Sequence, residues 1–114
     1  MDLTASIVHL AGAKLRMDQP LDGIDIVEQV RQGKADVART LFWRQRRGEN
    51  TWRGVRDGNL KLVSQQTGKK RDEWLFDLGN DVGEKTDLAA TRAGEMKRMQ
   101  ELLAKWEEEV KPTR

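Results

Sequence analysis

Helix-like hydrophobic spacing marks both ends of the chain, and strand-like runs fill its middle. Near the start, a polar sequence carries a short apolar stripe at helical spacing, made of Leu3, Ile7 and Leu10. This stripe predicts a helix within residues 2–12, with Asp2 or Thr4 as its N-terminal cap. Gly12 is expected to end the helix, because glycine readily adopts the backbone conformation found there.

A turn and a second short helix are predicted next. Residues 20–23 read Pro-Leu-Asp-Gly, which is turn chemistry. The apolar spacing that follows predicts a helix over residues 25–32, with Gly33 as its stop. The side chains expected to point inward are Ile26, Val27 and Val30.

The middle of the chain changes to short β-prone runs. They lie at residues 41–43, 52–55, 60–63 and 74–76. Turn residues at 47–50, 57–58 and 67–70 separate them, so three antiparallel connections predict a four-stranded meander. Alternation places Leu60 and Leu62 on one face of the sheet and Val63 on the other. By the same rule, Phe42 lies opposite Trp43.

The clearest element is the last one. A continuous apolar stripe recurs at spacings of three and four residues: Met96, Met99, Leu103, Trp106 and Val110. It predicts a helix of about 18 residues lying across one face of the sheet, ended before Pro112. Trp106 is expected to pack against the strands that carry Leu60 and Leu62. The fold class is therefore α+β, with short N-terminal helices.

Composition supports one folded domain over residues 1–114. Apolar residues make up 37% and charged residues 35% of the 114, which is typical of a folded chain with a charged surface. The net charge of +2 gives no strong global field for a nucleic acid or a membrane. The absence of cysteine excludes disulfides, thiolate nucleophiles and zinc–thiolate sites. No apolar run reaches the roughly 18 residues that span a bilayer.

Four motifs together resemble the C-terminal end of a sulfatase, a member of the alkaline-phosphatase-like hydrolases. In chain order they are DLTASIVHLAG at 2–12, PLDGID at 20–25, RDGNLKLV at 56–63, and WLFDL with DVGE and LA within 74–89. The sequence departs from the family pattern at several positions, among them Ser6 for Thr, Leu60 for an aromatic residue, Val82 for Pro and Asp87 for Asn. The order of the motifs is more specific than any one of them.

The resemblance implies an accessory subdomain of a sulfuric ester hydrolase of the arylsulfatase type. The family's reactive formylglycine, made from Cys or Ser in a C/S-x-P-S-R motif, and its calcium ligands have no counterpart in this sequence. Catalysis is therefore expected to lie in an N-terminal catalytic domain of the same protein, which is also the expected partner. The sulfated substrate would reach this chain through the parent enzyme. The compartment stays open, with a periplasmic or secreted parent as one option.

Two features of the sequence suggest a metal site, but neither meets the requirements of one. His9 is the one histidine in the sequence, and a metal site needs several ligands. The acidic stretch of residues 77–87 lacks the spacing of a calcium loop. Asp77 and Asp81 are expected to accept hydrogen bonds from backbone amides of that loop. No catalytic or metal-binding residue is assigned.

A basic cluster interleaved with tryptophans is the remaining candidate. It comprises Arg39, Arg44, Arg46, Arg47, Arg53, Arg56 and Lys61, with Trp43 and Trp52. A solvated strand face explains it most simply, and a nucleic-acid surface is the least favoured explanation. Because sulfate esters are anionic, the resemblance adds a third: Arg44, Arg46 and Arg53 as contacts on the substrate side. The alternative function is an autonomous binding module that uses an arginine–tryptophan face.

A chain lacking its catalytic domain is expected to self-associate. One helix covers only one face of the predicted sheet, and the first helix is expected to pack into the larger domain. Apolar area left open in this way favours a symmetric pair of copies, with Ile7, Val8 or Leu10 at the contact.

Overall fold

The computed structural model of the protein describes residues 1–14, 18, 20–35 and 37–110. The chain divides into two compact units, Met1–Val37 and Ala38–Arg114. The first unit holds two short helices, α1 (Asp2–Leu10) and α2 (Ile26–Arg31). The second unit holds a sheet and a helix, whose elements are β1 (Thr40–Arg47), β2 (Asn50–Asp57), β3 (Leu60–Thr67), β4 (Lys70–Asp77) and α3 (Ala93–Glu109). The predicted α+β class is confirmed.

Polar groups on α1 hold the two helices of the first unit together. Ser6 is fully buried, and its Oγ accepts hydrogen bonds from the amides of Ile26 at 3.1 Å and Val27 at 3.4 Å. Asp2 Oδ1 accepts from the amide of Ile24 at 3.2 Å. Amides at a helix start lack partners within the helix, so Ser6 satisfies two donors that α2 itself leaves open.

Two expectations about this unit are wrong in detail. Neither Asp2 nor Thr4 caps α1, because both lie within the helix; its N-cap is Met1, without a side-chain hydrogen bond. None of the three side chains expected to point inward on α2 is buried: Ile26 is 38% exposed, Val27 39% and Val30 81%. The predicted stops are confirmed, since Gly12 has φ +63° and Gly33 φ +60°, in the left-handed region that glycine tolerates.

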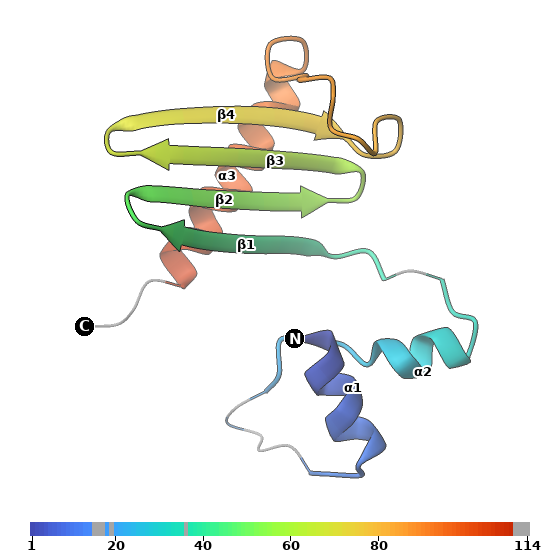
Figure 1. Ribbon diagram of the computed structural model, residues 1–114. Helices are drawn as coiled ribbons and strands as arrows, with labels where there is room; N and C mark the ends of the chain where they lie inside the picture. Colours follow the sequence, from blue (N-terminus) through green and yellow to red (C-terminus); the bar gives the residue numbers. More distant parts are fainter. Residues whose placement is uncertain (15–17, 19, 36, 111–114) are drawn as a thin grey trace. The chain divides into compact units, whose positions relative to one another are not determined.

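The sheet is an antiparallel meander in the order β1-β2-β3-β4 (Figure 1). Its three hairpins close at Gly48, Gly58 and Gly68, each with φ near +60°. A glycine with positive φ at the first turn position is typical of two-residue hairpin turns that match the twist of the strands. The four strands and three connections predicted from the sequence are confirmed, with each strand longer than its β-prone run.

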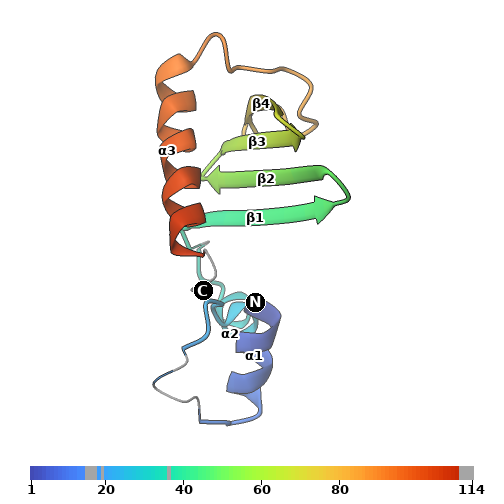
Figure 2. The ribbon, with the colours of Figure 1, turned by 90° about the vertical axis from the view of Figure 1, so that its left-hand side faces the viewer.

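Helix α3 lies diagonally across one face of the sheet (Figures 1 and 2). The core lies between the helix and the sheet. Its buried side chains are Val55, Leu60, Leu62, Leu75, Met99 and Leu103. Trp106 packs against this core and stacks on Phe42, with ring centroids 5.3 Å apart. The predicted stripe is confirmed except at its end: Val110 follows the helix as its C-cap and is partly exposed. Pro112 lies outside the described residues.

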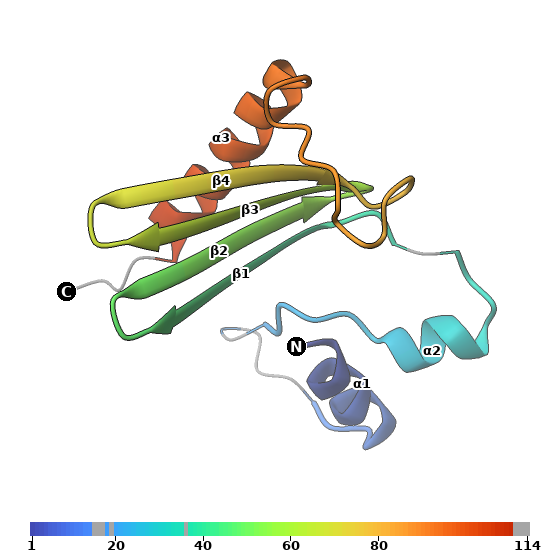
Figure 3. The ribbon, with the colours of Figure 1, turned by 45° about the horizontal axis from the view of Figure 1, so that its top comes forward.

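The loop from β4 to α3 passes along the outer edge of β4 (Figures 2 and 3). At Leu75 the loop supplies both hydrogen-bond partners: Asp87 Oδ1 accepts from the Leu75 amide at 3.0 Å, and the Leu88 amide donates to the Leu75 carbonyl at 2.8 Å. Asp81 accepts from the amides of Lys85 and Thr86, and Asp77 from that of Gly79. The structural role predicted for Asp77 and Asp81 is confirmed.

Candidate functional site

The register of the sheet separates the predicted arginine–tryptophan cluster into two faces. Phe42 belongs to the face under α3, so strand alternation places Arg44 and Arg46 on that same face. Arg53, which pairs with Arg44, also lies there. Trp43 and Trp52 lie on the opposite face. Arg44, Arg46 and Arg53 therefore do not share a face with the tryptophans, because alternation turns neighbouring residues to opposite sides of the sheet, whereas Arg47 and Arg56 lie on the tryptophan face.

The three candidate arginines are brought together at the β1–β2 hairpin end of the α3 face. Arg44 lies directly opposite Arg53, and Arg46 opposite Thr51. The side chain of Arg53 is 16% exposed, and its Nε donates to Glu107 Oε1 on α3 at 2.5 Å. Arg44 and Arg46 are exposed. The sequence prediction thus grouped these residues correctly but missed the glutamate that engages Arg53.

A hollow of about 380 Å³ adjoins this group. It is lined by Arg46, Glu49, Thr51, Arg53, Gln66 and Gly68. The lining supplies two guanidinium groups, a hydroxyl and a carboxamide. Thr51 and Gln66 were not singled out from the sequence, because their place beside the arginines depends on the pairing of β2 with β1 and β3.

No helix of the described part of the second unit covers the opposite face of the sheet (Figure 2). This face carries aromatic side chains, among them Trp52 and Trp74. The indole of Trp43 lies across Gly54, where a Cβ atom would approach Trp43 Cε2 to 2.2 Å. Lys61 Nζ lies 5.4 Å from the centre of that indole and 2.5 Å from Glu84 Oε1. Lys61 thus combines a cation–π contact with an ion pair.

A second hollow of about 510 Å³ lies on this aromatic face. It is lined by Trp52, Val63, Trp74, Phe76, Glu84, Lys85 and Asp87. The rings of Trp52 and Trp74 are within 19° of parallel, with centroids 6.5 Å apart. Trp43 and Trp52 are each 38% exposed. Such an aromatic surface is suited to covering by another apolar surface.

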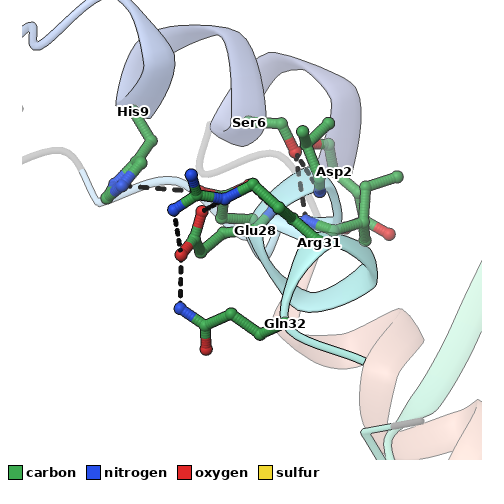
Figure 4. Close-up of polar contacts among 9 residues, drawn as sticks. Asp2, Ser6, His9, Glu28, Arg31 and Gln32 are labelled. Carbon is green, nitrogen blue, oxygen red and sulfur yellow. Dashed lines mark hydrogen bonds and ion pairs between the residues drawn. The ribbon is translucent and has the colours of Figure 1, made fainter. Parts of the chain in front are cut away.

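The lone histidine lies in the first unit, on α1 (Figure 4). His9 Nε2 is 3.7 Å from Asp25 Oδ2, and the His9 side chain is mostly exposed. Ser6 is no nucleophile, because its hydroxyl donates to the Asp2 carbonyl and accepts from two amides. Beside it, Arg31 forms two hydrogen bonds with Glu28, which hold the pKa of Glu28 below its ordinary value. This is surface ion pairing, not an active site.

The described residues also hold no metal centre. Among them, no group of three or more histidine or acidic side chains is placed to hold an ion. None of the helices in the described ranges is long and apolar enough to cross a bilayer. Within the described ranges, the geometry shows a hollow lined by two arginines and a partly exposed aromatic face, but no catalytic constellation.

Comparisons with known proteins are informative at the level of structure. No protein-family model and no curated protein matches the sequence. Among solved structures, Ps i-CgsB is similar with a TM-score of 0.72 and 23% identity, over 92% of this chain and 23% of its own. The protein yidJ from Bacteroides fragilis, named as a sulfatase, has a TM-score of 0.73 and 21% identity, over 94% and 24%. A 2-O GAG sulfatase has a TM-score of 0.70 and 23% identity, over 95% and 24%.

This is the fold of a sulfatase subdomain. At identities of 21–23% the likeness concerns the fold alone. The chain spans about a quarter of the length of these proteins. The chain therefore has the fold of one segment of these larger proteins.

Proposed function

We propose that this chain is the accessory subdomain of a sulfuric ester hydrolase, in which it completes the fold and walls one side of the substrate cleft. The observation that carries the proposal is the combination of a sulfatase-subdomain fold with an uncovered aromatic sheet face. The proposed partner is the catalytic domain of the same protein. That domain would correspond to the larger part of each structural neighbour, which this chain does not match.

The aromatic face supports an intramolecular partner. Trp43 and Trp52 are partly exposed indoles of this face, and Trp52 lines a hollow of about 510 Å³ whose walls include Trp74 and Phe76. Adjacent exposed aromatic rings are costly to leave in water and mark interaction surfaces. The Lys61–Glu84 pair at the border of this face adds a polar rim.

The chemistry belongs to the proposed catalytic domain. A formylglycine and a calcium ion would supply the nucleophile and the Lewis acid there. The residues of this chain do not fit either group: the sequence has no C/S-x-P-S-R motif, and the described residues hold no metal-ligand cluster. No catalytic step is assigned to this chain.

The proposed substrates are sulfated, and their anionic groups suit the arginines of the α3 face. One structural neighbour, Ps i-CgsB, was also solved in complex with k-i-k-neocarrahexaose, and another is named a 2-O GAG sulfatase. By analogy we propose a sulfated saccharide as the substrate class of the parent enzyme. Arg44, Arg46 and Arg53 remain the proposed contacts on the substrate side.

The test compares this chain with the longer polypeptide encoded in its reading frame. Translation of the coding sequence upstream of Met1 is expected to reveal a C/S-x-P-S-R motif. The purified chain alone is expected to hydrolyse no aryl sulfate above background, whereas the longer polypeptide is active. Hydrolysis by the chain alone that is lost on denaturation would contradict the proposal, as would an upstream frame without the motif.

In isolation the chain is proposed to self-associate. Leu3, Ile7 and Leu10 on α1 are each more than half exposed and form one stripe. A symmetric pair of copies would bury this stripe on both at once. By contrast, Arg44, Arg46 and Arg53 do not share a face with Trp43 and Trp52, and no observation favours an autonomous module with an arginine–tryptophan face.

A further inference from the structure

We propose that the α3 face of the sheet holds a tetrahedral oxyanion, sulfate or a sulfate-ester group, between the β1–β2 hairpin and the C-terminal turn of α3. The ligands are Arg46 and Arg53, with Arg44 as a nearby positive charge and Thr51 and Gln66 as neutral donors. Only the source of the anion, an ester group of the substrate, rests on the proposed function.

The first argument is a pair of like charges. Arg44 and Arg53 are register partners on neighbouring antiparallel strands and lie on the same face. The Cβ atoms of such directly opposite residues are about 5 Å apart, and like charges in this position destabilise a sheet. Glu107 offsets the charge of Arg53, so the positive charge of Arg44 is the one that an anion beside the pair would offset.

The second argument is an incompletely satisfied guanidinium group. Arg53 donates from Nε to Glu107, but its Nη1 is buried without a hydrogen-bond partner in the described part of the chain. A guanidinium group has five N–H donors, and a buried donor without an acceptor is costly. The Glu107 carboxylate accepts at Nε, which leaves the other N–H groups of the Arg53 guanidinium able to donate. An oxyanion can accept from two guanidinium nitrogens at once.

The third argument is the composition of the adjoining hollow. Its volume of about 380 Å³ exceeds what one sulfate group needs, and its walls include Arg46, Arg53, Thr51 and Gln66. Guanidinium, hydroxyl and carboxamide groups all donate hydrogen bonds to an oxyanion. Glu49 also lines the hollow and repels an anion, so the ligand is placed on the arginine side.

The charges of the group favour one anion. Three arginines, Arg44, Arg46 and Arg53, face two carboxylates, Glu49 in the hollow and Glu107 in the ion pair. The site therefore keeps an excess of positive charge after its internal pairing. The chemistry does not separate sulfate from phosphate, since both are tetrahedral and accept from the same donors.

The experiment is a titration of the ¹⁵N-labelled chain with sodium sulfate at constant ionic strength, followed by amide chemical shifts. Saturable shifts are expected at Arg46, Thr51 and Gln66. Arg46→Gln is expected to weaken binding by about tenfold, because it removes charge-assisted hydrogen bonds to the anion. The matched control is Arg47→Gln, which removes the same charge one residue further along β1, on the opposite face, and is expected to leave the affinity unchanged.

Second ligands identify the source of the anion. Methyl sulfate presents an ester group, whereas inorganic sulfate and phosphate are free anions. Binding of methyl sulfate with at least the affinity of sulfate assigns the site to an esterified substrate, and binding of the inorganic anions alone assigns it to a free anion. The site is refuted if no anion gives saturable shifts there, or if Arg47→Gln weakens binding as much as Arg46→Gln. Neither result depends on whether the longer polypeptide hydrolyses sulfate esters.

Discussion

Phe42 of β1 and Trp106 of α3 stack with ring planes 6° apart and centroids 5.3 Å apart. The contact ties the last turns of α3 to the first strand, although 64 residues separate the two side chains in the sequence. The backbone of α3 also approaches β2 and β3. The stack adds the first strand of the sheet to those that hold the helix.

Replacing Trp106 by alanine is expected to cost about 3–5 kcal/mol of unfolding free energy. The substitution removes both the packing of the indole on the core and its stack with Phe42. Urea unfolding followed by circular dichroism measures the loss. Trp52→Ala, on the aromatic face, is the control and should cost clearly less, because Trp52 is partly exposed. A loss below about 1 kcal/mol for Trp106→Ala would show that the stripe of α3 is not core.

Gly54→Ala is expected to destabilise the chain by about 1–3 kcal/mol. The new methyl group would lie 2.2 Å from Trp43 Cε2, so the indole must leave its place over β2 and its contact with Lys61. A change in tryptophan fluorescence should accompany the loss. The control is Gly94→Ala in α3, where no atom lies within 4 Å of the added Cβ and helix propensity favours alanine. Equal effects of the two substitutions would contradict the placement of Trp43.

Acid is expected to weaken the attachment of α3 through Asp57. The Arg98 guanidinium and then the Thr40 hydroxyl, both hydrogen-bonded to this carboxylate, hold the pKa of Asp57 below its ordinary value. A carboxyl with a depressed pKa in the folded state stabilises the fold above its unfolded pKa, near 4, and loses that contribution as pH falls through the folded value.

The stabilisation from Asp57 is therefore present at neutral pH and lost below about pH 4. Asp57→Asn should make stability less dependent on pH in this range, and Arg98→Gln should move the pKa of Asp57 back toward its ordinary value. A carboxyl NMR titration measures the second effect directly. An unchanged titration of Asp57 in the Arg98→Gln variant would show that the ion pair does not form in solution.

Self-association is expected to depend on the apolar stripe of α1. Light scattering at micromolar concentration should give the mass of a dimer for the isolated chain. Ile7→Glu together with Leu10→Glu should return it to a monomer, because two charges would then face the contact. Val30→Glu on α2 is the control, since Val30 is exposed outside that stripe. A clean monomer for the unmodified chain would contradict the idea that α1 normally lies against a larger domain.

Much of the second unit could be predicted from periodicity and turn chemistry. The stripe through Met99 and Leu103 marks the buried side of α3, and glycines at the hairpins mark where strands reverse. Both signals are local, since each depends on residues a few positions apart. The pairing of Phe42 with Trp106 is not local, and no pattern in the sequence indicates it.

The candidate site was harder to predict because it depends on register. Sequence adjacency grouped Trp43 with Arg44, but neighbouring strand residues point to opposite faces. The roles of Asp2 and Ser6 were missed for a related reason. Both are polar residues near a helix start, where capping is the usual role, yet they bind amides 20 or more positions away.

The hydrogen bonds at Leu75 also decide how copies of this sheet can add to one another. Asp87 and Leu88 already occupy the outward amide and carbonyl of Leu75, so at this residue the chain's own loop stands where an incoming strand would pair with β4. Growth of a continuous ribbon needs a strand to be accepted at both edges of every copy. If copies pair only through β1, the assembly ends at two copies. At that contact Arg44, Arg46 and Arg47 of one copy would lie near the same positive side chains of the other copy. The sheet is thereby protected against fibril growth by edge addition.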